Sequence, residues 1–409
     1  VVIDAAHFAP YALAAYTHLM YLFMHPACGL CGSNWFGSCC NLGYALSAND
    51  ISLTNQLYHF TVHRSAPVIG DNSCSINKTA MLKMVNNRNG ELVFANFSND
   101  LDIKPYGVFV DKDREAVVIT IRGTLSLEDC ISDALADAAS MKTAGEKWGF
   151  DGTKMYAHSG MLRAAMWMRQ DLESSGLLSD LLSPRGLRTP LNKKKYRQLV
   201  VVGHSLGAGT ASVLAVLLRP AYPSLVSFAY GAPGSVFDEK SSRAIQPFVT
   251  SVILGKDLVG SLSVKNLSIL RSKVLDALIR CKVNKNIVMR ALFEERAHDL
   301  DALMYAPGSE PDSDFKRMVE SFNGHMERRS IDMRREKLFI PGRVLHLVKT
   351  KTAKRCFHAK QKVYEPTEAD IMDFTEIKIS PTMVWEHFPD QYCDALDAVV
   401  ERWADGSAK

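Results

Sequence analysis

The stretch RQLVVVGHSLGAGTASVLAVLL, residues 197–218, constrains the fold of this chain more than any other part of the sequence. A short apolar run typical of a buried strand leads into Gly203-His204-Ser205-Leu206-Gly207, and Ala, Leu and Val then recur at helical spacing. A serine between two glycines at such a point implies a very tight turn, because a Cβ at either glycine would collide with the neighbouring strand or helix. The sequence therefore predicts a strand, a sharp turn that carries Ser205, and a helix.

A strand, a G-x-S-x-G turn and a helix in this order form the nucleophile elbow of α/β-hydrolases. In that arrangement Ser205 is a nucleophile exposed at the carboxyl end of the sheet, and Gly203 and Gly207 are the glycines that permit the turn. The backbone N–H of Leu206, at the start of the helix, can donate to a developing oxyanion. An ordinary glycine-rich turn is the alternative, and the strand and helix patterns on either side argue against it.

The rest of the pattern predicts strands that alternate with helices. Strands are expected at 106–123 (a hairpin turning at 111–114), 225–234, 248–257, 342–350 and 374–380. Helices are expected near 127–140, after His158, and in the segment YCDALDAVVERW near the C-terminus. Such alternation gives a mostly parallel sheet with helices on both faces, so we expect one α/β-hydrolase domain over residues 1–409.

Two segments depart from this pattern. Residues 271–340 are helical and heavily charged, and they interrupt the sheet by about 70 residues, which is long for a plain connection. We expect an inserted lid or regulatory segment there, with a solvated loop as the alternative for residues 305–330. Residues 1–50 are expected to form an apolar helix over 8–24 and a Cys-rich loop; the helix suits core packing or, alternatively, the surface of a bilayer.

A hydrolase serine needs a histidine to take its proton and a carboxylate to hold that histidine. In this fold the chain order is Ser, then Asp or Glu, then His, each after a strand. Asp257 fits this order, because it lies two residues beyond the apolar run SVILG. A turn residue, or a carboxylate paired with Lys256, is the alternative interpretation of Asp257.

Five histidines follow Asp257 in the sequence. Four lie in the charged insertion, inside a predicted strand or in a Lys-rich connector, namely His298, His325, His346 and His358. Only His387 is expected in a loop directly after the last strand and before the final helix. We therefore predict His387 as the general base, with a structural loop histidine as the alternative.

A second oxyanion donor should come from a loop after an earlier strand. The run VVITIRGT ends such a strand at Gly123-Thr124, and Thr124 could donate its backbone N–H and its hydroxyl. Thr124 or Ser126 could also cap a following helix, and the two roles are compatible.

The net charge of +4 is small for 409 residues, which argues against a dedicated nucleic-acid binder and allows an anionic membrane surface as partner. No run of about 18 apolar residues is present, so no segment is an unambiguous membrane span. The chain begins VVIDAAHF, without an initiator Met or a signal-peptide pattern, which is typical of a piece of a longer protein.

The nine cysteines form no regular framework, and an odd count of this kind indicates a reducing compartment. Four of them cluster at Cys28, Cys31, Cys39 and Cys40, where the adjacent pair is a poor half of a zinc site. We expect buried or free thiols, with S-acylation beside the apolar helix as the functional alternative. No metal and no cofactor are predicted.

The runs ITIRGT, AHSGMLRAA, VVVGHSLGAGTA, FAYGAPG and VILGKDLV resemble the class 3, fungal-type lipases. The similarity covers most of residues 1–271 and 340–403, and it is greatest to the sn-1-specific diacylglycerol lipases. In that family the catalytic serine, aspartate and histidine match Ser205, Asp257 and His387. The family also has membrane-spanning helices ahead of its catalytic domain and an insertion thought to act as a regulatory loop.

This resemblance implies a serine hydrolase that cleaves the sn-1 ester of diacylglycerol through an acyl-enzyme. The product would be a 2-monoacylglycerol such as 2-arachidonoylglycerol, and the domain would be membrane-associated and face the cytoplasm. A triacylglycerol lipase or phospholipase A1 is the alternative within the class, and a catalytically inactive lipid-binding scaffold is the alternative outside it. The basic amphipathic segment 264–283 and the helix 8–24 are the expected membrane contacts, although an ordinary helix packed on the sheet would explain the first equally well.

Overall fold

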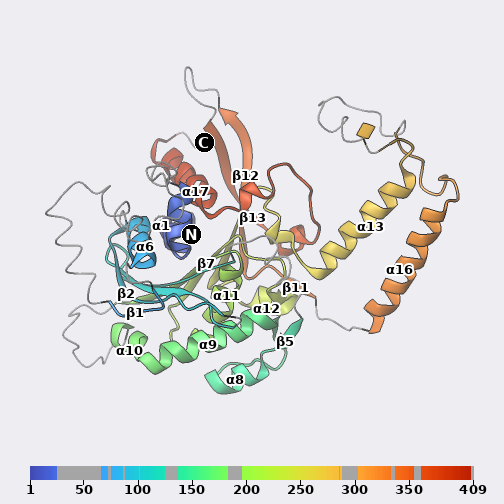
Figure 1. Cartoon of the computed structure of the whole chain (residues 1–409). Coiled ribbons are helices and arrows are strands. Elements are labelled where there is room, and N and C mark those ends of the chain that lie inside the picture. Colours follow the sequence, from blue (N-terminus) through green and yellow to red (C-terminus); the bar gives the residue numbers. More distant parts are fainter. Residues whose placement is uncertain are drawn as a thin grey trace, which may run out of the picture. The chain divides into compact units, whose positions relative to one another are not determined.

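The computed structural model describes residues 1–24, 66–71, 75–85, 88–100, 102–124, 137–182, 196–284, 286–287, 303–332, 337–353 and 361–406 (Figure 1). Of residues 325–332, 351–353 and 361–362 it describes the backbone only. The chain forms two compact units. One comprises Val1–Ser263 with Lys337–Lys409, and the other is Val264–Glu336.

The first unit is built on a nine-stranded sheet in the order β1-β2-β3-β4-β7-β8-β10-β12-β13. Five neighbouring strands run parallel: β4 (Ala116–Ile121), β7 (Gln198–His204), β8 (Val226–Tyr230), β10 (Val249–Leu254) and β12 (Arg343–Ala353). The flanking strands are β1 (Val68–Ile69), β2 (Gly90–Asn96), β3 (Tyr106–Asp111) and β13 (Gln361–Ala369). The strands β4 and β10 are buried along their whole length, which agrees with their mostly apolar sequences.

Helices cover both faces of this sheet. On one face, α9 (Ser159–Ser175) and α11 (Leu206–Leu218) pack with β4 and β7 in one apolar core. On the other face, α1 (Val2–Ala14), α6 (Ile76–Val85) and α17 (Pro389–Ala404) form a second core with the sheet, and α1 lies beside α17 (Figure 1). The layers and strand order confirm the predicted α/β-hydrolase fold with a mostly parallel sheet.

The first unit also contains a smaller sheet of short strands. It has the order β11-β9-β6-β5, comprising Leu338–Phe339, Phe237–Asp238, Tyr156–His158 and Ala138–Ser140. Further short helices of the first unit are α8 (Lys142–Trp148), α10 (Leu177–Leu182) and α12 (Glu239–Ala244), of which α12 contacts β9 and β11 of this sheet. The helix predicted near 127–140 is therefore wrong at its end, where β5 forms, and its residues 127–136 lie outside the described part of the chain.

The end of the sheet also differs from the sequence prediction. Residues 374–380 are not a strand, because Asp370 and Asp373 form a capping box that turns the chain into a 3-10 helix at Ile371–Phe374. The last strand is instead β13, which pairs antiparallel with β12 at the sheet edge. An edge strand tolerates the proline and charges of QKVYEPTEA, and these residues hid the strand in the sequence.

The N-terminal segment is two helices, not the single helix predicted at 8–24. The chain breaks at Ala15-Tyr16, Thr17 takes a positive φ of 58°, and α2 then spans Thr17–Met24. Helix α1 is buried in the core, where Thr120 Oγ1 donates to the carbonyl of Tyr11 at 2.7 Å. Helix α1 is thus a core helix, which is the first of the two interpretations of the apolar N-terminal segment. The cysteine cluster at Cys28, Cys31, Cys39 and Cys40 lies outside the described residues.

The second unit consists mainly of α13 (Val264–Arg280) and α16 (Asp314–Asp332). The Arg271 guanidinium lies 5.3 Å from the ring centroid of Phe322 across the pair. The bounds of the second unit, 264–336, lie close to those of the insertion predicted at 271–340. The role of this insertion as a lid or regulatory segment stays a prediction. Within the described ranges, neither unit has a helix both long enough and apolar enough to span a bilayer.

Candidate active site

The turn between β7 and α11 has the geometry that its glycines predict. Ser205 sits between the strand and the helix with φ 59° and ψ −130°, a strained conformation for a residue with a side chain. A Cβ on Gly203 would collide with the carbonyl oxygen of Gly207, and a Cβ on Gly207 would collide with that of Ile121. Both glycines are therefore required by close backbone approach.

Ser205, His387 and Asp257 meet at the carboxyl ends of the parallel strands. His387 Nε2 lies 3.0 Å from Ser205 Oγ, and His387 Nδ1 lies 3.0 Å and 2.9 Å from the two carboxylate oxygens of Asp257. Because an ionised carboxylate only accepts, Nδ1 carries the proton and Nε2 is left to accept from the serine. This arrangement can deprotonate Ser205 as it attacks. The catalytic roles of the three residues stay predictions.

Each of these side chains comes from a different element. Ser205 follows β7, Asp257 lies three residues beyond β10, and His387 ends a 3-10 helix, Trp385–His387. The sequence placed His387 directly after the last strand. The structure corrects this, because β13 ends at Ala369, well before His387.

The carboxylate of Asp257 is buried and hydrogen-bonded on several sides. Tyr392 donates its hydroxyl to Oδ2, and the N–H of Val259 donates to Oδ1 at 2.8 Å. Burial by itself raises the pKa of Asp257, but the nearby His387 and these hydrogen bonds outweigh it, so the pKa is lowered. Lys256 instead donates its backbone N–H to Glu386 at 2.8 Å. Asp257 is thus held as an anion facing His387.

The two predicted oxyanion donors lie beside the serine. Leu206 is the first residue of α11, directly after Ser205. A Cβ on Gly123, which precedes Thr124, would lie 3.1 Å from Ser205 Cβ, so the loop after β4 borders the nucleophile. Thr124 and Leu206 remain predicted donors, and Ser126 lies outside the described residues.

The other histidines are placed elsewhere or lie outside the description. His346 is on β12, and its Nε2 donates to the carbonyl of Gly255 at 2.7 Å, so it holds the turn before Asp257. His298 and His358 lie outside the described residues, and the side chain of His325 is not described.

Sequence reasoning missed two residues that border the triad. Tyr392, on α17, donates to Asp257, and its only sequence signal is its place one turn after His387. His204, the variable residue of the G-x-S-x-G turn, is buried and has its Nε2 2.7 Å from the carbonyl oxygen of His387. Burial, and after it the proximity of His387, lowers the pKa of His204 to about 3. His204 is therefore neutral at ordinary pH.

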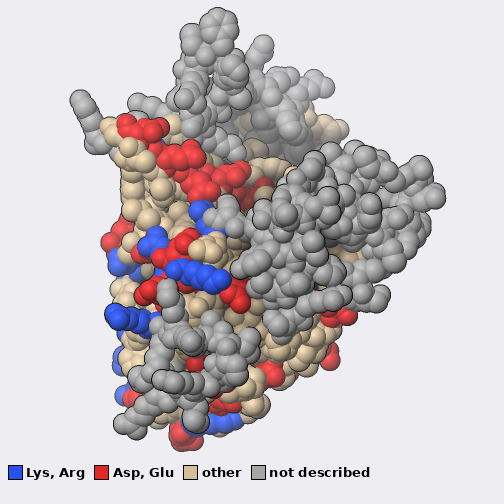
Figure 2. Space-filling view, turned by 90° about the vertical axis from the view of Figure 1, so that its left-hand side faces the viewer, with Lys and Arg blue, Asp and Glu red and all other residues tan. Residues whose placement is uncertain are grey.

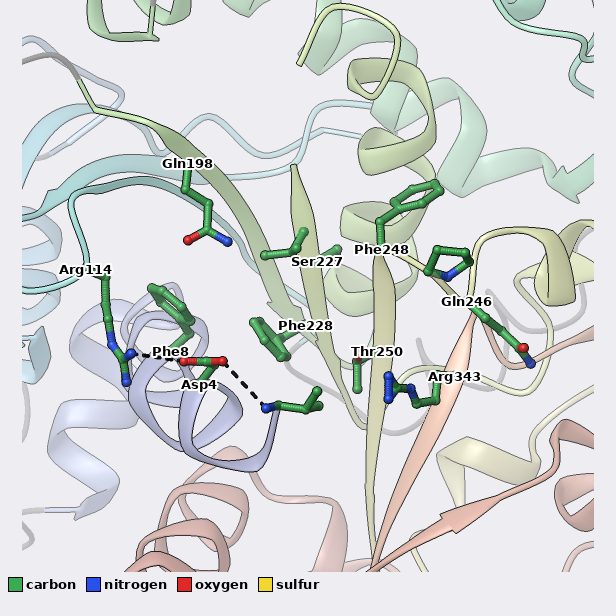
Figure 3. A pocket seen from close by; sticks show the side chains of 13 residues that line it. Asp4, Phe8, Arg114, Gln198, Ser227, Phe228, Gln246, Phe248, Thr250 and Arg343 are labelled. Carbon is green, nitrogen blue, oxygen red and sulfur yellow. Dashed lines mark ion pairs between the residues drawn. The ribbon is translucent and has the colours of Figure 1, made fainter. Parts of the chain in front are cut away.

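The described residues contain no group of three or more His, Cys, Asp or Glu side chains placed to hold a metal ion. Figure 3 shows a separate cavity of about 280 Å³ at the amino ends of the parallel strands. Ser205 lies at the other end of these strands, where they terminate. Phe8, Phe228 and Thr250 line the cavity, and Asp4 pairs with Arg114 at 3.1 Å on its rim. This cavity takes no part in the triad.

Residues 118–267 match the family described as Lipase (class 3). Diacylglycerol lipase-alpha of Homo sapiens is 32% identical over 98% of this chain, and the chain covers 36% of that protein. Diacylglycerol lipase-beta of Mus musculus is 29% identical over 96% of this chain, and the chain covers 56% of it. The chain therefore spans about a third to about half of the length of these relatives.

Among solved structures, the mono- and diacylglycerol lipase from Aspergillus oryzae is similar, with 20% identity and a TM-score of 0.40 over 64% of this chain and 73% of that one. The fold assigned above rests on the sheet order and the elbow of this chain itself. The class 3 lipase match includes Ser205 and Asp257, and the curated relatives extend the similarity over nearly the whole chain. Over nearly its whole length the chain is thus homologous to a part of the diacylglycerol lipases, and its residues 118–267 match the class 3 lipases.

Proposed function

We propose that this chain is a serine hydrolase that cleaves an acyl ester of diacylglycerol and releases a fatty acid. The observation that carries the proposal is the hydrogen-bonded series Ser205, His387 and Asp257 at the carboxyl edge of the sheet. The diacylglycerol substrate is inferred from the names of the relatives, which are similar to this chain over nearly all of its length.

In this mechanism His387 Nε2 takes the proton of Ser205 Oγ as the oxygen attacks the ester carbonyl. Asp257 stabilises the imidazolium that forms, and the N–H groups of Leu206 and Thr124 donate to the oxyanion. His387 then protonates the leaving glyceride oxygen, so an acyl-enzyme remains on Ser205. A water molecule, deprotonated by His387, attacks that acyl group and releases the fatty acid.

The finer substrate assignment follows from the family resemblance. We propose hydrolysis at the sn-1 position, which leaves a 2-monoacylglycerol such as 2-arachidonoylglycerol. Triacylglycerol lipase and phospholipase A1 remain the alternatives, because pocket shape sets headgroup and chain preference.

A diacylglycerol substrate is held in a bilayer, so the enzyme needs apolar surface beside Ser205. Exposed apolar side chains lie on α2 and directly before His387 in the chain: Leu19, Phe23 and Met24 of α2, with Val384 and Trp385. The ring centroid of Phe23 lies 6.4 Å from that of Trp385. We call these five residues the apolar mouth, and propose that it contacts the membrane from which the substrate is drawn.

The charges visible on one face of the protein do not favour a nucleic-acid partner. On the face in Figure 2, acidic side chains gather toward the top, and acidic and basic side chains mix below, so the described residues form no continuous basic surface there. We propose a membrane-associated domain on the cytoplasmic side, in keeping with the odd and irregular cysteine count.

The test is hydrolysis by the purified chain of diacylglycerol, triacylglycerol, monoacylglycerol and phospholipid, each in vesicles of one base composition. Diacylglycerol should be the fastest substrate, and diacylglycerol labelled in one chain should release label from the sn-1 position. Faster cleavage of phospholipid or triacylglycerol would favour phospholipase A1 or triacylglycerol lipase, the alternatives within the class. Labelling of wild type but not Ser205→Ala by a fluorophosphonate distinguishes an active hydrolase from an inactive lipid-binding scaffold.

A further inference from the structure

We infer that His204 and Tyr16 are positioning residues that hold the backbone of His387 so that its imidazole meets both Ser205 and Asp257. The inference rests on the proposed serine-hydrolase function. It adds a connection from the N-terminal helices, through the elbow, to the general base.

The contacts form one continuous series. The Tyr16 hydroxyl lies 2.8 Å from His204 Nδ1, and His204 Nε2 lies 2.7 Å from the carbonyl oxygen of His387. Tyr16 and His204 are both buried, so water does not replace these partners. The rings of His204 and His387 also lie together, with centroids 4.7 Å apart.

The chemistry of the partners fixes the direction of each hydrogen bond. The carbonyl of His387 can only accept, so His204 Nε2 carries a hydrogen and donates it. His204 is neutral, so its Nδ1 is unprotonated and accepts from the Tyr16 hydroxyl. Tyr16 therefore selects the tautomer of His204 that can hold His387. His204 is also unable to act as a second base, because both of its nitrogens are engaged.

His387 needs such support because of where it lies in the chain. It ends a 3-10 helix of three residues, and its N–H donates to Val384 at 3.2 Å, within the same short segment. The bonds to Asp257 and Ser205 hold only the ring. The bond from His204 holds the backbone from which the ring projects, and a displacement of about 1 Å at a catalytic group can cost about 10²-fold in rate.

Tyr16 also borders the predicted oxyanion loop. A Cβ on Gly123 would lie 2.5 Å from the Tyr16 hydroxyl, so that hydroxyl packs directly against the residue before Thr124. Tyr16 lies at the break between α1 and α2, with α1 anchored in the core. The Tyr16 hydroxyl at this break therefore lies next to His204 and Gly123, beside the proposed active site.

The experiment compares Tyr16→Phe, His204→Leu and His204→Gln with wild type on a short soluble ester. A glutamine amide offers a donor and an acceptor, as neutral imidazole does, whereas leucine offers neither. Tyr11→Phe is the matched control. Tyr11 lies on α1 and is buried, as Tyr16 is, but its hydroxyl donates to Asp111, remote from the triad. Thermal unfolding of every variant accompanies the kinetics.

We expect His204→Leu to lower kcat by about 10²-fold with KM nearly unchanged, because the ester is bound but the base is misplaced. Tyr16→Phe should lower kcat by about tenfold, since the tautomer is no longer selected. His204→Gln should recover most of the loss, and Tyr11→Phe should keep the wild-type kcat. Rescue by glutamine is not expected of a residue that only fills space.

Wild-type kcat in both Tyr16→Phe and His204→Leu would overturn the inference, and so would a His204→Gln variant that is folded but as slow as His204→Leu. If His204→Leu does not fold, Tyr16→Phe and His204→Gln decide the matter. Ser205→Ala is measured alongside. If Ser205→Ala is inactive while the pair variants are normal, only this inference fails; if Ser205→Ala is active, the proposed function fails with it.

Discussion

Phe23 of α2 stacks on Phe388, the residue after His387, with ring centroids 5.4 Å apart and ring planes 12° from parallel. Trp385 packs on the same phenylalanine, with centroids 5.3 Å apart. The N-terminal segment therefore forms a wall beside the general base, although about 360 residues separate Phe23 from Phe388 along the chain.

Ser205→Ala should abolish ester hydrolysis and leave the fold intact, because it removes one hydroxyl from a turn whose backbone is set by its glycines. The expected loss in kcat is more than about 10⁴-fold. Steady-state kinetics and thermal unfolding measure the two effects. Near-normal hydrolysis by this variant would show that another nucleophile operates.

His387→Ala should be as damaging as Ser205→Ala, since no base then accepts the serine proton. His346→Ala is the matched control. Its side chain bonds to the carbonyl of Gly255 and makes none of the hydrogen bonds that join Ser205, His387 and Asp257, so most activity should remain. The reverse outcome, with His346 essential and His387 dispensable, would contradict the site assigned here.

Asp257→Asn should lower kcat by about 10⁴-fold while the protein stays folded. An asparagine amide can donate to His387 Nδ1, which would move the histidine proton to Nε2 and prevent that nitrogen from accepting from Ser205. The measurement is kcat across a range of pH. Loss of less than tenfold would mean that the carboxylate does not set the tautomer.

Phe23→Asp with Trp385→Asp should weaken binding to liposomes and diacylglycerol turnover, because charge in the apolar mouth opposes contact with lipid. Turnover of a short soluble ester should change much less. Trp403→Asp is the matched control, since Trp403 is similarly exposed (40% against 47% for Trp385) but lies about 20 Å along α17 from Phe388. Equal loss on both substrates would indicate misfolding.

The same assay examines the second predicted membrane contact, on α13. Val274 and Leu278 are exposed on that helix, and their joint replacement by Asp should lower liposome binding if the segment contacts lipid. Unchanged binding would reject α13 and leave the apolar mouth as the proposed surface.

His204 should make the stability of the protein depend on pH. Its pKa is about 3 in the folded state and about 6.5 when unfolded, so below pH 6.5 the unfolded chain takes up a proton that the folded chain does not. The stability that the neutral, buried His204 contributes is therefore fully present above pH 6.5, and it is lost progressively as the pH falls from 6.5 toward 3. Between pH 7 and pH 5 the free energy of unfolding should fall by about 2 kcal/mol on this account.

Urea unfolding of wild type and His204→Gln at pH 7 and pH 5 measures this effect. Other titrating groups act on both proteins and cancel in the difference. The variant should therefore show a shallower pH dependence, by about the same 2 kcal/mol. Identical slopes would mean that His204 is not buried in its neutral form.

The parts of the site that the sequence predicted are those set by local pattern. The glycines of the elbow and the apolar run before Asp257 each require a particular backbone within a few residues, so the sequence predicts that Ser205 and Asp257 follow strands, as they do in the structure. His387 was selected by elimination and by chain order. The segment between β13 and His387 begins with the capping box at Asp370, which ends the strand pattern there. The alternating pattern of 374–380 predicts a strand instead, so the sequence does not reveal this turn.

The residues that the sequence did not predict depend on long-range contacts. Tyr16 and His204 are 188 positions apart, and neither has a local signal for the other. The break between α1 and α2 likewise falls within a mostly apolar segment, where periodicity alone predicts one helix. The position of this break, and with it that of Tyr16, depends on how α1 packs against the sheet.

The neighbouring positions of α1 and α17 have a consequence for the order of folding. These helices come from opposite ends of the chain, and both contribute to the core on one face of the sheet. During synthesis α1 emerges first and must wait for nearly 400 further residues before its partner exists. The part of its apolar surface that packs on α17 lacks its partner until then, so we expect the growing chain to be prone to aggregation. Truncation within α17 should therefore leave a protein that is degraded soon after synthesis, not merely one that is less active.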